Sequence, residues 1–493
     1  MHILDEIATG ARLVVHQKIK APLTSPALLI RELDLAGKGP LALLDSAGGA
    51  PALCRFSFLA WDPRLVLTIR DGAATVRTEA GIFSGVPAGD PFLLLRVLLA
   101  RLAPGEAPEA AELGLPLSGG AFGLIGYDAC RYIEKLPRQA ADDLGFPELC
   151  FIFPRRLICY DHLEGAAHLF FEDPSRGDME RATAALLGCA GLEPEPAAQV
   201  DRRGFGLSAR ARSNVSRGSY KNMVRRAKEY IFAGDIFQAN LSQRLEIPYG
   251  GDSLELYSAL RAVNPSPFAG YLDLDGFQLV SSSPERLVQL NAGTAQTRPI
   301  AGTRGRGGDG IEDDLLTEEL NLDQKERAEH IMLVDLERND LGKVCSYGSV
   351  RVNELMVNEA YSHVIHIVSN VKGELHEGKD ALDLLKAMFP GGTITGCPKV
   401  RCMQIIDELE PVRRGPYTGS FGYIGYNGNM DMNIIIRTLV RRGGMVYAQA
   451  GAGIVVDSDP EREYRETLRK AEAMVNAVRL AGKRERRLDQ ALT

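Results

Sequence analysis

Two pairs of glutamates in this 493-residue chain are spaced to present carboxylates on one side of a helix. Glu326 and Glu329 lie in KERAEHIMLVDL, and Glu463 and Glu466 lie in DPEREYRETLRKAEAMV. Because residues three apart share a helix face, the members of each pair can act together. Four carboxylates converging from two helices would suit a hard, hydrated cation such as Mg²⁺. Glutamates are also common on solvated helix faces and in first turns, so spacing alone leaves both interpretations open.

Two histidines occur in the alternating apolar run AYSHVIHIVSN, a pattern that predicts a strand. His363 and His366 are three residues apart, so they point to opposite faces and only one of them is expected to face a site. A histidine in a pocket could transfer protons near neutral pH, and a hydrogen-bonded structural histidine is the alternative.

Arg437 ends the buried-strand pattern MDMNIIIR and therefore needs an anionic partner. A substrate carboxylate or a structural aspartate or glutamate could equally supply it. Further along, residues 449–453 (QAGAG) have the composition of a small-residue turn after a strand. Such a turn would let a ligand approach the backbone closely.

The stretch 389–408, FPGGTITGCPKVRCMQIIDE, places a glycine-rich turn before a helix that is expected to open near Lys399. The free N–H groups and the positive dipole of a helix start suit an anion, and the lysine would add charge. An ordinary helix start with Lys399 in solvent is the alternative. The sequence contains no Ser/His/Asp order, no GxSxG and no papain- or caspase-like cysteine context.

Composition narrows the class of protein further. The chain is 45% hydrophobic and 25% charged with a net charge of −7, which makes nucleic acid an unexpected partner. No apolar run approaches the roughly 20 residues of a membrane span, and the N-terminus lacks the pattern of a signal peptide. The eight cysteines are scattered without a CxxC pair, which favours free thiols in a reducing cytoplasm over a zinc site.

Strand and helix patterns follow one another without the regular order of a βαβ protein, which favours an α+β fold with largely antiparallel sheets. A glycine-studded strand is expected at 119–128, where the glycines indicate close backbone packing. Asp459 and Pro460 are expected to open the helix that carries the second glutamate pair. Other expected strands cover 41–46, 55–59, 65–69, 149–153, 157–160, 168–171, 237–245, 268–274, 277–281, 287–290 and 294–299, and other helices cover 27–33, 90–102 and a segment from 220.

Composition also divides the chain into four segments. An N-terminal region covers 1–172, and a linker with one short helix and the exposed runs EPEPAA and DRRGFG covers 173–219. The region 220–482 carries the chemical motifs, and a charged tail with KRERR covers 483–493.

In this order, the motifs together resemble the chorismate-utilising enzymes, specifically component I of anthranilate synthase and of aminodeoxychorismate synthase. The motifs are LLDSA (43–47), GGAFGLIGYD (119–128), GDIFQANLSQR (234–244), SSSPERL (281–287), RPIAGTRGRG (298–307), ERAEHIMLVDLERNDLGKV (326–344), YSHVIHIVSN (361–370), TGCPKVRCMQIIDELEPVRRGPY (395–417), IIIRT (434–438) and QAGAGIVVDSDPEREYRET (449–467). The resemblance implies a two-lobed α+β fold, with largely antiparallel sheets in a central sandwich and helices packed outside. It also implies an enzyme that aminates chorismate.

The resemblance further implies roles for individual residues. The four glutamates would hold Mg²⁺, which in turn would grip the ring carboxylate of chorismate. His366 would assist loss of the ring substituent or of pyruvate, Thr303 would line the ring, and Ala301 would help to decide where nitrogen is added. The residues implied in substrate binding are Arg437, Tyr417, Lys399, Thr395, Gly302, Gly451 and Gly453.

The source of ammonia is not written in this chain, because the class I glutaminase elbow GxCxGxQ is absent from the sequence. The resemblance therefore implies free ammonia, or ammonia from a separate class I glutaminase subunit in a heterodimer or heterotetramer.

Two amination reactions compete. Ala301 follows the anthranilate pattern, since aminodeoxychorismate synthases commonly carry a lysine there that attacks ring carbon 2. Against this, FQANL and ITG resemble the aminodeoxychorismate branch, and the positions of the tryptophan feedback pocket depart from the anthranilate pattern. Those positions are Asp45, Ser46, Pro267, Phe268, Ala269 and Asn433. The resemblance thus favours 4-amino-4-deoxychorismate synthase, with anthranilate synthase as the alternative.

Two further interpretations of the function rank below these two amination reactions. Isochorismate and salicylate synthases share the scaffold, but the motifs of the ammonia-using enzymes match better. A chorismate-binding pseudoenzyme would need broken metal-site glutamates, and all four are present.

Overall fold

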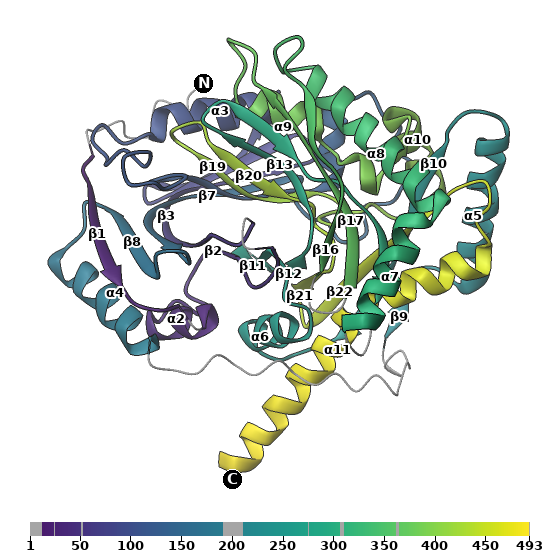
Figure 1. Ribbon diagram of the computed structural model, residues 1–493. Helices are drawn as coiled ribbons and strands as arrows, with labels where there is room; N and C mark the ends of the chain where they lie inside the picture. The colour runs from purple at the N-terminus through teal and green to yellow at the C-terminus, as the bar shows by residue number, and fades with distance from the viewer. Residues whose placement is uncertain are drawn as a thin grey trace.

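One long strand, β3 (Phe56–Arg70), is the point from which two sheet branches diverge in the computed structural model of the chain (Figure 1). The structure describes residues 12–23, 25–50, 53–190, 211–274, 276–305, 310–360 and 364–492. The first half of β3 pairs with β2 (Leu41–Asp45), and its second half pairs with β4 (Ala73–Thr78). The other edge of β3 pairs with β7 (Leu149–Asp161) over nearly its whole length.

Each branch is a succession of antiparallel pairs in which strands from distant parts of the sequence alternate. The first runs from β3 through β7, β6 (Gly120–Ile125), β19 (Ser420–Gly425), β20 (Met430–Asn433), β13 (Arg286–Asn291) and β14 (Thr294–Thr297) to β17 (Val364–Glu374), which also pairs with β15 (Ile300–Gly305) and β16 (Arg351–Ala360). The second runs from β3 through β2, β11 (Phe268–Leu274), β12 (Phe277–Ser283), β21 (Thr438–Arg442) and β22 (Met445–Ile454) to β10 (Gln238–Pro248), which also pairs with β9 (Arg212–Ser213) and β18 (Gly396–Cys397). Outside these branches, β8 (Ala166–Glu172) joins β7 to β1 (Val14–Lys20), and β4 joins β3 to β5 (Gly81–Pro87).

A hydrophobic core fills the space between the two branches. Phe58, Phe122 and Phe421 meet there with Leu272 and Leu279, so inward-facing side chains come from both branches. Packing of one sheet on another through such alternating inner positions defines a sandwich. The predicted α+β fold, with largely antiparallel sheets in a central sandwich, is therefore confirmed.

Helices cover the outer faces of this sandwich (Figure 1). On one side lie α2 (Pro26–Glu32), α4 (Arg176–Cys189), α6 (Ser253–Val263) and α11 (Pro460–Leu492). On the other lie α3 (Pro91–Leu102), α5 (Arg217–Phe232), α8 (Gln324–Gly342), α9 (Ala381–Met388) and α10 (Lys399–Leu409), with α7 (Gly310–Leu322) against β15. Short 3₁₀ turns are η1 (Tyr127–Tyr132) and η2 (Gly392–Ile394).

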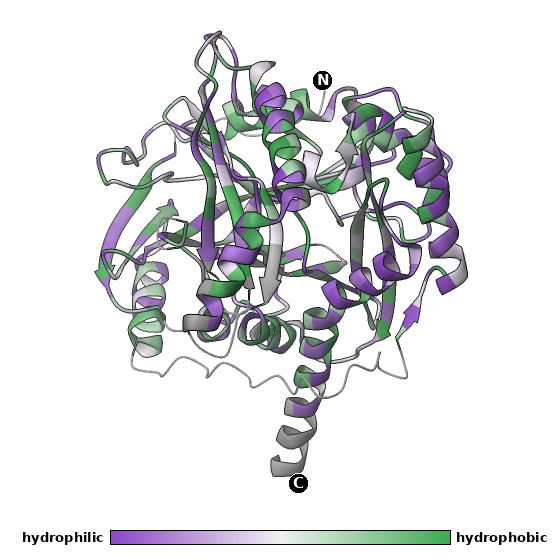
Figure 2. Cartoon of the chain, turned by 45° about the vertical axis from the view of Figure 1, so that its right-hand side comes forward, coloured by the Kyte–Doolittle hydropathy of each residue, from purple (hydrophilic) through white to green (hydrophobic). Residues whose placement is uncertain are grey.

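Local capping explains where several helices begin. Asp90 accepts hydrogen bonds from the N–H groups of Phe92 and Leu93 and so opens α3. Asp459 does the same for Glu461 and Arg462 at the start of α11, as the sequence predicts. The C-terminal helix α11 extends away from the body, and Figure 2 shows hydrophilic and hydrophobic bands alternating along it.

Three predictions about strands are wrong. The strands predicted at 55–59 and 65–69 form the single strand β3, and those at 149–153 and 157–160 form β7. Asp62, with φ +54°, and a register shift between Pro63 and Leu65 bend β3 without ending it, because β7 continues beside it. The turn predicted at 449–453 is instead the interior of β22, which pairs with β10 throughout.

The glycine-studded strand packs as predicted. A Cβ added at Gly123 of β6 would lie 2.1 Å from the carbonyl oxygen of Cys150 on β7. In the described part of the chain, no helix has the length and apolar character needed to cross a bilayer. None of the eight cysteines, all of which lie within the described residues, forms a disulfide bond.

Candidate active site

The far ends of the two branches approach each other, and most of the predicted site residues lie there. β15 and β17 come from the first branch, with His366 opposite Thr303 in the pairing. β10 and β22 come from the second branch, with Ser242 opposite Gly451. The two ends are joined through α8, because the side-chain amide of Gln238 on β10 donates to Glu329 at 2.9 Å.

An ammonium group lies among the predicted metal-binding glutamates. Lys470 of α11 donates to the carbonyl of Gly451 at 3.1 Å and lies 3.8 Å from a carboxylate oxygen of Glu466. Burial lowers the pKa of Lys470, and nearby carboxylates oppose that shift. Those carboxylates belong to Glu466, Glu463 and Glu329. Sequence reasoning missed this lysine, although it lies four residues after Glu466 and seven after Glu463 and hence on the same helix face.

The fourth glutamate lies on the opposite wall. A Cβ added at Gly302 of β15 would lie 3.4 Å from a carboxylate oxygen of Glu326. Two buried amide oxygens, Oε1 of Gln238 and Oδ1 of Asn240, have no hydrogen-bond donor within the described residues. With the glutamates they make an all-oxygen donor set, which fits a hard cation such as Mg²⁺. Among the described residues, however, no three acidic, histidine or cysteine side chains already converge to metal-binding distance.

His366 is a neutral imidazole in this site. The side chain is 8% exposed, and one ring nitrogen, Nδ1, lies 3.3 Å from the carbonyl oxygen of Gly302. Burial, with a smaller contribution from the positive charge of Arg437, lowers the pKa of His366 to about 4. At neutral pH the ring can therefore accept a proton but does not begin as an acid. His363, the other predicted histidine, lies outside the described residues.

A buried carboxyl that sequence reasoning missed lies close by. Glu285, between β12 and β13, is 6% exposed, and burial raises its pKa to about 7. The N–H of Ile300 and the charge of Lys470 partly oppose that rise. A carboxyl that titrates near neutrality inside a site is a candidate acid or base. Its only sequence signal is its position in SPERL.

Arg437 and Tyr417 form the cationic and phenolic wall of the site. Arg437 lies between β20 and β21 in a left-handed conformation, φ +52°, and its guanidinium donates to the carbonyl of Lys470. The N–H of Gly451 faces the Tyr417 hydroxyl, and a Cβ added at Gly451 would lie 2.9 Å from that oxygen. A Cβ at Gly453 would lie 2.4 Å from the Gln238 amide nitrogen. Both glycines therefore leave the strand backbone open to the site.

Lys399 and Thr395 make contacts that differ from the anion-binding turn the sequence suggests. The ammonium of Lys399 pairs with buried Asp340 of α8 and donates to the carbonyl of Met388 at 3.0 Å. The hydroxyl of Thr395 donates to the carbonyl of Gly391 at 2.8 Å. These contacts fix the turn before α10. Ala301 lies in β15, 9% exposed, whereas the side chain of Thr303 is outside the described residues.

The six positions of the predicted tryptophan pocket lie together: five are on or next to β2 and β11 of the second branch, and Asn433 is at the end of β20 in the first. Asp45 pairs with Ala269 in the sheet, and Pro267 and Phe268 come directly before it. Asn433 donates its amide to the carbonyl of Phe268 at 3.1 Å. Ser46 is also engaged, because its hydroxyl donates to the carbonyl of Phe56 at 2.7 Å.

Internal partners neutralise the acidic group of this cluster. Asp45 is 2% exposed, and its carboxylate accepts from the hydroxyl of Tyr257 at 2.6 Å and from the guanidinium of Arg261 at 2.7 Å. The amide oxygen of Asn433 accepts from the N–H of Phe421 at 3.0 Å. The polar side chains that an amino-acid effector would need are thus already paired.

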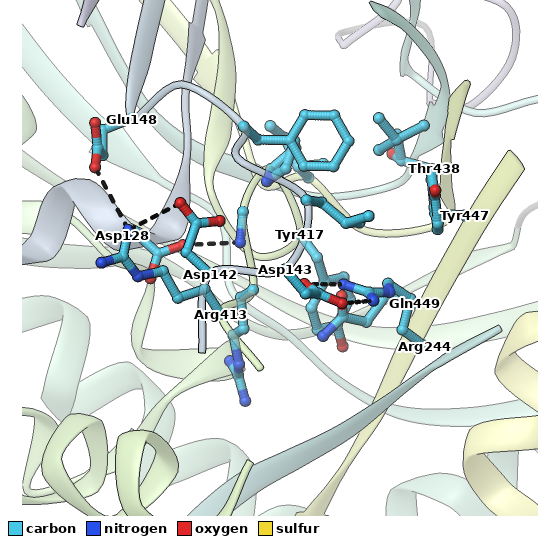
Figure 3. Close-up of a pocket in the computed structure, with 17 residues that line it drawn as sticks. Asp128, Asp142, Asp143, Glu148, Arg244, Arg413, Tyr417, Thr438, Tyr447 and Gln449 are labelled. Carbon is cyan, nitrogen blue, oxygen red and sulfur yellow. Dashed lines mark hydrogen bonds and ion pairs between the residues drawn. The ribbon is translucent and has the colours of Figure 1, made fainter. Parts of the chain in front are cut away.

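A separate pocket lies behind Tyr417, between the segment 142–148 and the strands β21 and β22 (Figure 3). Its charged walls are paired: Arg244 with Asp143 at 3.1 Å, and Arg413 with Asp142 at 3.3 Å. Burial raises the pKa of Glu148, which also lines it, to about 7. The cavity is small, about 30 Å³ in volume, with room for roughly two waters. We interpret this pocket as part of the contact between the two halves of the chain.

Comparison with known proteins yields one family and close relatives. The family model described as chorismate binding enzyme matches residues 64–476. Anthranilate synthase component 1 of Thermus thermophilus is 47% identical over 450 residues, covering 91% of this chain and 94% of the relative. Aminodeoxychorismate synthase component 1 of Bacillus subtilis is 42% identical over 444 residues, covering 89% of this chain and 92% of the relative.

A solved structure agrees with the fold. The crystal structure of anthranilate synthase component I from Streptococcus pneumoniae TIGR4 superposes with a TM-score of 0.72 at 33% identity. The superposition covers 86% of this chain and 93% of that chain.

Proposed function

The chain belongs to the chorismate-binding enzyme family, and from this premise we propose that it is the component I subunit of a Mg²⁺-dependent chorismate aminase, a 4-amino-4-deoxychorismate synthase. The observation that carries the proposal is that cationic groups, open backbone and carboxylates line the same site. Arg437 contacts the backbone of Lys470, and the ammonium of Lys470 lies beside Gly451 and Glu466. A Cβ added at Gly453 would lie 3.8 Å from a carboxylate oxygen of Glu329. Chorismate is a dianion, so one carboxylate suits the arginine and the other suits a metal held by the glutamates.

In this proposal the four glutamates on α8 and α11 would hold Mg²⁺, which when bound polarises the ring carboxylate of chorismate. They are Glu326, Glu329, Glu463 and Glu466. Arg437 orients the second carboxylate, and Gly302 lets the ring approach β15 because no side chain occupies that position.

Proton transfer falls to Glu285, whose charge state differs from that of a carboxyl group in water. With its pKa raised to about 7, Glu285 retains a proton in part of the population, can donate it to the departing hydroxyl group, and can then take up the proton that the added ammonia releases. His366, neutral above a pKa of about 4, is too weak a base for that proton and would assist loss of the hydroxyl group as a hydrogen-bonding partner. The net reaction at ring carbon 4 consumes chorismate and ammonia and releases water.

The choice of ring carbon 4 rests on the cluster around Asp45. A committed enzyme of tryptophan synthesis needs an open tryptophan site. Here the Asp45 carboxylate already accepts hydrogen bonds from Arg261 and Tyr257. The second candidate is anthranilate synthase component I, which aminates ring carbon 2 and also releases pyruvate. Ala301 favours it, and so does the name of the Thermus thermophilus relative.

The test is product analysis with the purified chain, chorismate, Mg²⁺ and ammonium at alkaline pH. We expect chorismate to be consumed and an amine that keeps its enolpyruvyl group to form, detected by mass. Fluorescent anthranilate with free pyruvate as the sole product would instead establish the second candidate. Isochorismate without any amine would refute both.

Tryptophan supplies an independent readout. We expect millimolar tryptophan to leave the rate unchanged and to produce no thermal stabilisation, because the polar groups around Asp45 are already paired. Inhibition by tryptophan would contradict the interpretation that the Asp45 cluster binds no tryptophan, and it would favour anthranilate synthase.

A further inference from the structure

A largely buried ion pair lies beside His366 at the end of the first branch. Arg298, between β14 and β15, donates from Nε and Nη2 to one carboxylate oxygen of Glu359 on β16, at 3.1 Å and 2.5 Å. Their side chains are 14% and 11% exposed. A buried ion pair adds little net stability to a fold, so its charges are better explained by the groups that lie next to them.

Strand register places Glu359 next to His366. β16 and β17 are antiparallel, and Glu359 lies directly opposite His366 in the pairing. Residues opposite each other in such a pair point to the same face of the sheet, with Cβ atoms about 4.5–5.5 Å apart. β14 and β15 pair with the other edge of β17, so the guanidinium of Arg298 reaches across β17 to hold Glu359 beside the imidazole.

This face of β16 and β17 is turned toward the second branch. The positive charge of Arg437, which precedes β21, acts on His366. Cys54, which follows β2, lies close to Glu359: burial raises the pKa of its thiol to about 11, and the carboxylates of Asp45 and Glu359 add to that rise. Glu359 and His366 therefore lie between the two branches, where the candidate site is.

Opposite charges act on the imidazole from two sides. Burial and Arg437 lower the pKa of His366, whereas the carbonyl of Gly302 and the carboxylate of Glu359 oppose that shift. The contact from Nδ1 to the Gly302 carbonyl oxygen, at 3.3 Å, is longer than an ordinary hydrogen bond of about 2.9–3.0 Å. That contact alone holds the ring weakly, so a second group is needed to fix its direction and its polarity.

We propose that Glu359 is a positioning residue of the active site: anchored by Arg298, it orients His366 and offsets the charge of Arg437. The inference rests on the proposed function, in which His366 is a hydrogen-bonding partner of the departing hydroxyl group. A negative charge beside the ring strengthens its hydrogen bonding, and a fixed ring needs no rearrangement during the reaction. Glu359 acts only through His366, and a double-mutant cycle can resolve that dependence.

The test measures chorismate consumption at saturating ammonium in the wild type, Glu359→Gln, His366→Ala and the double variant. Glu359→Gln keeps the shape of the side chain and an oxygen for Arg298, but removes the charge. We expect kcat to fall about 10-fold, with KM for chorismate within about twofold of the wild type. In the His366→Ala background the same substitution should lower kcat by less than about twofold.

Glu354→Gln is the matched control. Glu354 also lies on β16 and also pairs with Arg298, but it is opposite Asn370 instead of His366. This variant should keep kcat within about twofold of the wild type. Glu359→Asp, which retains the charge, should keep more of the wild-type kcat than Glu359→Gln does.

Histidine NMR supplies a readout that needs no turnover. The signal of His366 is identified by its loss in His366→Ala and is followed from pH 7 to pH 4.5. In Glu359→Gln it should begin to titrate at a lower pH than in the wild type, because the carboxylate no longer favours the protonated ring. In Glu354→Gln the titration should match the wild type.

Two kinetic results would overturn the proposal. One is a wild-type kcat in Glu359→Gln, and the other is a full 10-fold loss when the same substitution is made in His366→Ala. If the wild-type chain consumes no chorismate even with ammonium, the proposed function fails. The NMR titration then still decides the role of Glu359, since an unchanged His366 titration in Glu359→Gln would refute its action on the ring.

Discussion

Gly451→Ala tests whether the face of β22 is part of the active site. A Cβ at this position would lie 2.3 Å from Oδ1 of Asn240, 2.9 Å from the Tyr417 hydroxyl and 3.0 Å from the carbonyl oxygen of Leu241. The last contact is with the backbone of β10, which is fixed in the sheet by β22 itself. The strand cannot move away cheaply, so the clash falls on the two side chains that face the site.

The expected magnitudes follow from these contacts. Overpacking of a buried position costs about 1–3 kcal/mol, which should lower the melting temperature by several degrees without unfolding the chain. Displacing Tyr417 by about 1 Å should lower kcat/KM for chorismate about 100-fold, corresponding to about 2.7 kcal/mol of transition-state stabilisation. The assay is chorismate consumption at saturating ammonium, with calorimetry on the same preparation.

Gly250→Ala is the matched control, since Gly250 has no neighbour within 4 Å of an added Cβ and no left-handed φ. It should leave both quantities unchanged. Asn240→Ala combined with Gly451→Ala removes the closest clash and should recover part of the lost stability. Wild-type kcat/KM in Gly451→Ala would refute the placement of β22 in the site.

Three further predictions concern charges. Glu329→Gln should lower ammonium-dependent turnover by about 100-fold and weaken Mg²⁺ activation with an unchanged circular dichroism spectrum; unchanged turnover would remove Glu329 from the metal site. Arg414→Met leaves Glu410, whose side chain is 3% exposed, without its guanidinium partner at 2.7 Å, and should cost about 3–5 kcal/mol in denaturant unfolding. Glu285 has its pKa raised to about 7 in the folded chain, so its contribution to stability is complete below its unfolded pKa of about 4.5 and is lost as pH rises to about 7. Glu285→Gln should therefore lessen the loss of stability between pH 5 and pH 8 by up to about 3 kcal/mol, and an unaltered slope in urea unfolding would contradict the assignment.

Sequence patterns predict correctly those structural features that depend on interactions between residues close together in the chain. Asp459 before Pro460 predicts the start of α11 correctly because the cap is made by side chain and backbone within three residues. The strands predicted at 55–59 and 65–69 are in fact one strand, because β7 continues to pair with β3 past Asp62 and Pro63. The strand composition of residues 449–453 is likewise hidden by glycine and alanine, and only the pairing of β22 with β10 reveals it.

Sequence patterns do not predict which side chains from distant segments of the chain contact each other. Lys399 has the sequence context of an anion-binding helix start, yet its ammonium pairs with Asp340 on α8, 59 residues earlier in the sequence. Lys470 shares a helix face with Glu463 and Glu466, which the sequence displays, but its place among the carboxylates depends on how α11 packs against β22. The positions of the predicted glutamates relative to one another likewise depend on how α8 and α11 pack. The spacing of the glutamates within either helix does not specify that packing.

The topology links the Asp45 cluster to the active site through hydrogen-bonded strands alone. β2 carries Asp45 and pairs with β11, and the same branch continues through β12 and β21 to β22, which carries Gly451. A ligand that moved β2 against α6 would therefore also move the strands hydrogen-bonded to β2 in series, which position the site. In this chain Arg261 and Tyr257 of α6 already hold the Asp45 carboxylate, so β2 is anchored to α6 without any effector.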